Sequence, residues 1–77
     1  PQVYLQTLQR MGLAAGQCLA IEDSSNGLQA ACAAGLATLI TPNRFTAHHN
    51  FDAALRVVPD LQGVTVAQLQ AWHADRA

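Results

Sequence analysis

The chain has 77 residues, of which 51% are hydrophobic and 12% are charged, and its formal net charge at pH 7 is −1. A charge this close to zero gives no electrostatic attraction to nucleic acids or anionic membranes, so we expect neither as a partner. The sequence has no apolar run near the roughly 18 residues of a membrane span and no signal peptide at its start, so we expect a cytoplasmic protein.

The first predicted element is a helix that begins near Pro1 and ends at Gly12, a residue that suits the left-handed closing position. Its apolar residues recur at the spacing of one helical face, at Tyr4, Leu5, Leu8 and Met11. A turn through residues 14–16 follows. The continuous apolar run 18–21 then predicts a strand that is buried on both faces, as in a parallel sheet.

A second helix is predicted from about Gly27 to Ala34, followed by a strand at 37–41. One face of this helix carries mostly small residues, which let a helix lie close against a sheet: Leu28, Ala31, Cys32 and Gly35. The order helix, strand, helix, strand implies parallel pairing of the two strands with a right-handed crossover.

A loop is expected from Pro42 to about Asn50, then a helical turn near 51–55 and a short edge strand at 56–58 that Pro59 stops. The last helix has the clearest local signals in the chain. Thr65 and Gln68 have the spacing of a capping box, and Val64 and Leu69 that of a hydrophobic staple. Its expected apolar stripe consists of Val66, Leu69 and Trp72.

Polarity changes abruptly after the first predicted strand, where Glu22 and Asp23 follow one another. In open α/β sheets, ligands bind at this edge, outside the carboxyl ends of the strands. Mg²⁺ prefers oxygen ligands and usually takes one or two carboxylates together with phosphate oxygens and waters. Ser24 or Ser25 can cap the next helix, and Gly27 leaves room where the turn becomes helix. Spacing alone leaves two interpretations open, a metal site and a plain helix cap.

The full string around the two acids favours the metal site. Residues 21–35 read IEDSSNGLQAACAAG and closely resemble the fourth motif of haloacid-dehalogenase-like (HAD) phosphatases, I-E-D-S-x-x-G-x-x-A-A-x-A-A-G. Residues 1–4 are similar to the end of their third motif, K-P-x-P-x-x-Y. Further segments resemble the CbbY-like and β-phosphoglucomutase-like subgroup of this family: 39–43, 45–46 and 51–54.

The resemblance spans about residues 1–61 and implies an α/β fold for the chain. Residues 1–77 would form the C-terminal portion of a Rossmann-like HAD core domain, with a parallel sheet and flanking helices. By the same resemblance, Asp23 would be a direct Mg²⁺ ligand. Glu22 would hold the metal through water or position its shell, while Ser24 and Asn26 would shape the loop.

The resemblance further implies that the complete protein is a Mg²⁺-dependent phosphatase acting on a small phosphorylated metabolite, a sugar phosphate. Its nucleophile would be the first Asp of an upstream D-x-D motif, which would form an aspartyl-phosphate. This chain has no D-x-D motif and no cap region, and the lysine of the third motif would lie three residues before Pro1. We therefore expect the 77 residues alone to be inactive and prone to self-association.

Two alternatives remain open at this stage. A phosphomutase of the β-phosphoglucomutase type would use the same core, and the features that distinguish it would lie in the absent cap region. A truncated, non-catalytic remnant would only associate with other chains. The intact I-E-D-S-x-x-G string argues against long decay of an ancestral enzyme.

Other reactive side chains have no assigned role. Cys18 and Cys32 are expected to be buried thiols of a reducing cytosol, and not a disulfide or a metal pair. His48 and His49 are neighbours whose side chains point apart, which indicates solvated loop residues. Arg44 is expected to be an exposed loop residue without the geometry for bidentate phosphate capture.

Overall fold

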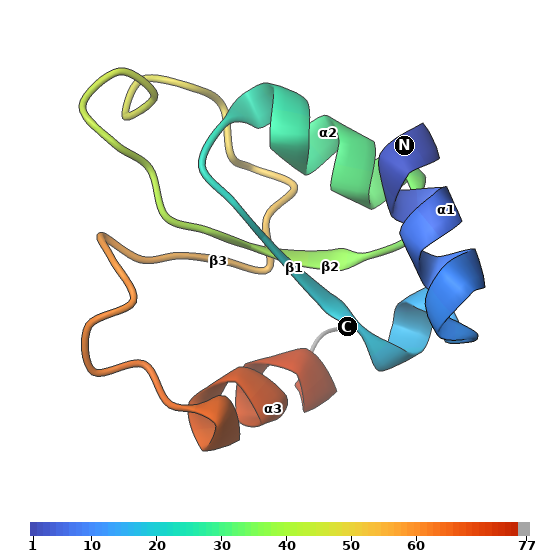
Figure 1. The fold of residues 1–77 in the computed structure, drawn as a ribbon. Coiled ribbons are helices and arrows are strands. Elements are labelled where there is room, and N and C mark those ends of the chain that lie inside the picture. Colours follow the sequence, from blue (N-terminus) through green and yellow to red (C-terminus); the bar gives the residue numbers. More distant parts are fainter. Residues whose placement is uncertain (76–77) are drawn as a thin grey trace.

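The computed structural model describes residues 1–75 and contains three α-helices, a 3₁₀ turn and three strands (Figure 1). No helix in this range is long and apolar enough to cross a membrane. In chain order the elements are α1 (Gln2–Met11), η1 (Ala15–Gln17), β1 (Leu19–Glu22), α2 (Ser25–Ala33), β2 (Ala37–Ile40), β3 (Arg56–Val57) and α3 (Val66–Ala74).

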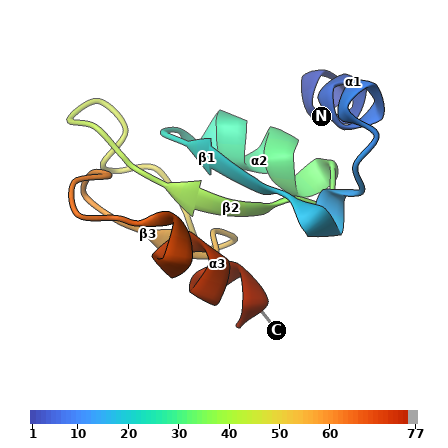
Figure 2. The same ribbon diagram turned by 60° about the horizontal axis from the view of Figure 1, so that its bottom comes forward.

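The strands form one parallel sheet in the order β1-β2-β3, which confirms the predicted α/β class. Leu19 pairs with Ala37 at one end of the β1–β2 ladder, and Glu22 pairs with Ile40 at the other. Helices α1 and α2 lie on one face of the sheet and α3 lies on the other (Figure 2). All three strands therefore end at the same edge, between two helical layers.

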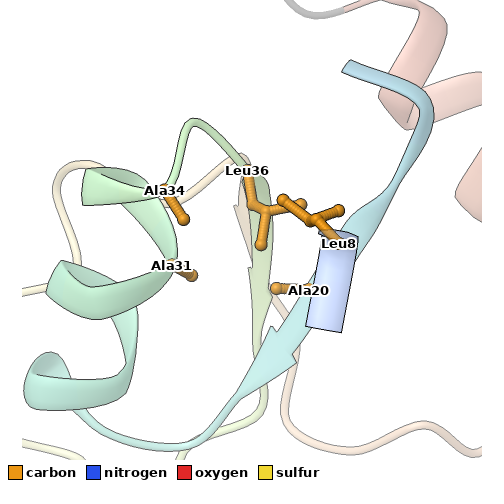
Figure 3. Packing of buried hydrophobic residues seen from close by; sticks show 5 residues of the cluster. All are labelled: Leu8, Ala20, Ala31, Ala34 and Leu36. Carbon is orange, nitrogen blue, oxygen red and sulfur yellow. The ribbon is translucent and has the colours of Figure 1, made fainter. Parts of the chain in front are cut away.

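Helix α2 packs on the sheet through Leu28 and Ala31, its two buried residues, and through Ala34 at its C-cap. Ala31 is fully buried, and Ala34 lies beside it over Leu36, Ala20 and Leu8, so α1, α2 and the two strands share one small core (Figure 3). Gly35 follows the helix with a φ of 84°, a conformation that favours glycine. The predicted stripe of this helix is confirmed for Leu28 and Ala31, whereas Cys32 and Gly35 are exposed.

The central strand β2 is the best buried element. Thr38, Leu39 and Ile40 are almost completely covered, and the Thr38 hydroxyl donates to the carbonyl of Leu36 at 3.2 Å. Strand β1, at the edge of this sheet, is different, because Ile21 is 42% exposed. The expectation that this strand is buried on both faces is wrong for the described residues.

The apolar face of α1 is also less covered than its spacing predicted. Leu8 is buried, but Leu5 and Met11 are more than half exposed. Cys18 is half-buried and Cys32 is exposed, and both are free thiols. The prediction of two buried thiols is therefore wrong, because the stripe of α2 faces the sheet through Ala31 and Ala34 and leaves Cys32 at its side.

The segment between β2 and β3 contains turns and no helix in the described structure. At 51–55 a single turn forms, in which the amide of Ala54 donates to the carbonyl of Phe51 at 3.0 Å. The predicted edge strand is present as β3, and the amide of Val58 extends its ladder by donating to Ile40 at 2.9 Å.

Helix α3 begins where its capping signal predicted. The Thr65 hydroxyl accepts from the amide of Gln68 at 3.0 Å, which is one half of the predicted capping box. Val66, expected in the apolar stripe, is 70% exposed. The helix is attached instead by its last turns, where Trp72 lies under the Arg56 guanidinium, 4.6 Å from the ring centre.

Candidate metal and phosphate site

The acidic loop joins the end of β1 to the start of α2. Glu22 is the last residue of β1, so the strand extends one residue further than expected. Asp23 follows it, and Ser24 caps α2 by accepting a hydrogen bond from the amide of Gly27 at 3.1 Å. This bond fixes the turn that presents the two acids at the carboxyl edge of the sheet.

Glu22 faces the helical layer because side chains alternate along a strand. Ala20, two residues earlier, packs in the core with Ala31 and Ala34, so Glu22 lies on the same side of the sheet. There the hydroxyl of Tyr4 donates a hydrogen bond to Glu22 Oε1. The contact links α1 to the acidic loop across 18 residues of sequence.

Gly27 makes room for this carboxylate. A Cβ atom placed on Gly27 would collide with Glu22 Oε2 and lie 3.1 Å from Glu22 Cγ. The predicted spatial role of Gly27 therefore has a definite cause, the Glu22 side chain.

Asp23 points in a different direction. Its side chain is exposed, and Asn43 Nδ2, in the loop after β2, approaches Asp23 Oδ2 at a long 3.4 Å. The Asn43 side chain is itself held, because its Oδ1 accepts from the amides of Phe45 at 2.8 Å and Thr46 at 3.1 Å. Asp23 thus keeps lone pairs available for a ligand. Asn43 lies in the segment 39–43 that resembles the CbbY-like subgroup, but its contact with Asp23 was not predicted.

The start of α2 receives a second cap from a distant loop. The amide of Ser25 donates to His49 Nδ1 at 3.1 Å, and Ser25 Oγ lies 3.2 Å from the same nitrogen. His49 is therefore not the solvated loop residue that was expected. The amides of Ser25 and Gly27 both donate to side chains, so two amides in the first turn of α2 are already satisfied.

The donor set that the described residues offer to a cation is small. Across residues 1–75, no group of three or more His, Cys, Asp or Glu residues could hold a metal. Two acids at one strand end still match the usual share of protein ligands for Mg²⁺, which keeps several waters and takes phosphate oxygens as well. Asn26 is exposed at the first turn of α2, and its role in shaping the loop stays a prediction.

Parallel strands, helices on both faces and acids at the carboxyl edge define a Rossmann-like α/β domain.

No family model matches the chain. It is, however, 46% identical over 89 residues to protein CbbY (plasmid) of Cupriavidus necator, covering 95% of this chain and 35% of that protein. It is also 39% identical over 70 residues to a haloacid dehalogenase-like hydrolase domain-containing protein of Arabidopsis thaliana, covering 91% of this chain and 22% of the relative.

Solved structures agree with these relatives. CbbY from Rhodobacter sphaeroides in complex with phosphate matches with a TM-score of 0.86 and 32% identity, over 91% of this chain and 32% of that one. A mutant of that CbbY in complex with xylulose-(1,5)bisphosphate matches with a TM-score of 0.85 and 33% identity. The match covers 90% of this chain and 31% of the mutant chain. The chain belongs to the haloacid dehalogenase-like hydrolases, in their CbbY-like group. It spans about a third or less of the length of these proteins.

A side chain added at Gly27 would collide with Glu22, so its effect on stability should depend on whether Glu22 is present. Gly27→Ala should stabilise helix α2 by about 0.5–1 kcal/mol, because alanine favours the helical conformation more than glycine does. The new methyl group should also displace the Glu22 carboxylate from Tyr4. In the wild-type background the two effects oppose each other, and the variant should gain little or lose stability. In a Glu22→Ala background the obstacle is absent, so the same change should stabilise. Urea unfolding of the four proteins measures both steps, and equal effects in the two backgrounds would contradict the steric role.

Tyr4 gives a pH prediction. Burial, the hydrogen bond to Glu22 and the charge of that carboxylate raise the pKa of Tyr4 from 10.0 to about 12. Because the folded pKa lies above the unfolded value, this contribution to stability is complete below pH 10.0 and is lost as the pH rises to about 12.

The measurement is an ultraviolet titration of tyrosinate in the 77-residue chain, in which Tyr4 is the only tyrosine. Glu22→Gln should lower the midpoint, but not to the unfolded value, because burial is the largest cause. A native midpoint near 10.0 would show that Tyr4 and Glu22 do not meet in solution.

Proposed function

We propose that the complete protein is a Mg²⁺-dependent phosphatase whose substrate is a small sugar phosphate. The observation that carries this proposal is the position of Asp23, an exposed carboxylate at the carboxyl edge of a parallel sheet in a CbbY-like chain. A structural helix cap would need only Ser24, whose hydroxyl already accepts a hydrogen bond from the backbone amide of Gly27. Nothing in the cap explains two acids in succession.

In this proposal Asp23 binds the metal directly and Glu22 acts through water. The chemistry of the donors supports this division. Asp23 is exposed, with one long hydrogen bond from Asn43, whereas Glu22 is half-buried, accepts from Tyr4 and rests over Gly27. When bound, Mg²⁺ would neutralise phosphoryl charge and help to align the reacting groups. The nucleophilic Asp and the phosphate-binding Lys would come from the rest of the protein.

The substrate class rests on the relatives. The solved mutant of CbbY from Rhodobacter sphaeroides holds xylulose-(1,5)bisphosphate, and another structure of CbbY from that organism holds phosphate. A phosphorylated sugar is therefore the first compound to test, with release of inorganic phosphate as the readout. Formation of an isomeric sugar phosphate without phosphate release would identify a phosphomutase instead.

The metal assignment is tested by Asp23→Asn in the full-length protein that carries this sequence. Loss of a formal charge facing the cation should lower turnover about 100-fold or more, since metal charge stabilisation is worth several kcal/mol. Glu22→Gln should have a smaller effect. Asp75→Asn is a matched control, because Asp75 is an exposed carboxylate at the end of α3. Mg²⁺ dependence and rate near wild type in Asp23→Asn would make the metal assignment wrong.

The 77 residues alone should have no phosphatase activity at any Mg²⁺ concentration. They contain no D-x-D nucleophile motif and offer the cation only Glu22 and Asp23 at one strand end. We also expect the isolated chain to self-associate, because Ile21 and the outer face of α1 expose apolar surface. An assay with a generic aryl phosphate and size-exclusion chromatography measure the two properties. Turnover that disappears in Asp23→Ala would overturn the first expectation.

A further inference from the structure

The Glu22 carboxylate is confined from two sides. Tyr4 of α1 donates to its Oε1, and its Oε2 occupies the space that a Cβ on Gly27 of α2 would need. Glu22 therefore contacts both α1 and α2. These two helices cover one face of the sheet (Figure 2). Neither contact exists for Asp23, the exposed member of the pair.

Tyr4 is well placed to set the position of Glu22. Its ring packs against the core cluster of Leu8, Ala20 and Ala31, and this packing restricts where the hydroxyl can lie. Tyr4 and Glu22 both line an open hollow of about 560 Å³ between the start of α1 and α2. A rigid donor beside an open space can hold a carboxylate at one position while leaving the neighbouring Asp23 accessible.

We infer that Tyr4 is a positioning residue of the metal site, whose hydroxyl holds Glu22 in place and so makes the geometry of the acidic loop depend on how α1 is docked. This inference rests on the proposed function. Tyr4 acts through Glu22 and touches neither the cation nor the substrate. The hydroxyl of Tyr4 is the only part of the residue that this role requires, because the ring already fills its place in the core.

The test uses Tyr4→Phe, which removes the hydroxyl and keeps the ring, in the metal-free full-length protein. The Mg²⁺ dissociation constant, measured by titration calorimetry, should rise about 10-fold, the lower end of the effect of losing a partner that orients a metal site. Thr7→Val is the matched control. It removes another hydroxyl from α1 beside the same hollow, one that donates to the carbonyl of Val3 at 2.8 Å.

A double-mutant cycle separates positioning from general stability. In a Glu22→Gln background, Tyr4→Phe should change the Mg²⁺ dissociation constant less than it does in the wild-type background. High Mg²⁺ concentrations should restore the turnover of the Tyr4→Phe single variant. Substrate KM at saturating Mg²⁺ should stay near wild type. Equal effects in both backgrounds, or an unchanged Mg²⁺ dissociation constant in Tyr4→Phe, would overturn the inference.

Asp23→Asn distinguishes this failure from failure of the proposed function. If Asp23→Asn abolishes Mg²⁺ binding and Tyr4→Phe has no effect, only the role of Tyr4 is wrong. If Asp23→Asn leaves Mg²⁺ binding unchanged, the metal assignment and the inference that rests on it are both overturned.

Discussion

The parallel pairing of β1 with β2 is the constraint on which the rest of the structure depends. Because the two strands run in the same direction, the residues that follow them meet at one edge, which brings Asn43 to Asp23. The amide of Thr41 donates to the carbonyl of Glu22 at 2.9 Å and carries the pairing to the last residue of β1. The alanine face of α2 allows this geometry, because a helix that begins directly after the acids must pack against the strands it connects. A larger side chain in place of Ala31, which is fully buried, would push the helix away and move the acidic loop with it.

Local signals in the sequence predicted most element boundaries. Gly12 ends α1 with a φ of 67°, Ser24 and Thr65 cap α2 and α3, and the two main strands lie within a residue or so of their expected positions. Each of these features depends on groups only a few residues apart, such as the 3.1 Å bond from the Gly27 amide to Ser24. The acidic loop could be predicted for the same reason, since its acids, cap and glycine are contiguous.

Burial and long-range contacts could not be predicted in this way. The apolar run of β1 indicates a strand that is covered on both faces, but Ile21 is 42% exposed in this edge strand. His49 caps α2 from a position 24 residues after Ser25, and no spacing rule connects a loop histidine to a helix start. The helical spacing of Tyr4 predicted a core residue but not its hydrogen bond to Glu22. Its ring belongs to the core, while its hydroxyl belongs to the site.

Glu22 and Asp23 show how one strand end can give two neighbouring carboxylates different chemistry. Alternation turns Glu22 toward the helical layer, where its negative charge meets a hydroxyl donor and the start of α2. Asp23 lies beyond the last strand pair and is exposed to solvent. Glu22 would lose its hydrogen bond from Tyr4 if it turned to bind a cation, whereas the exposed Asp23 accepts only one long hydrogen bond, from Asn43. The fold therefore favours Asp23 as the ligand and Glu22 as the fixed negative charge behind it. Because Glu22 contacts both α1 and α2, a movement of either helix would shift this carboxylate and, through it, the proposed metal site.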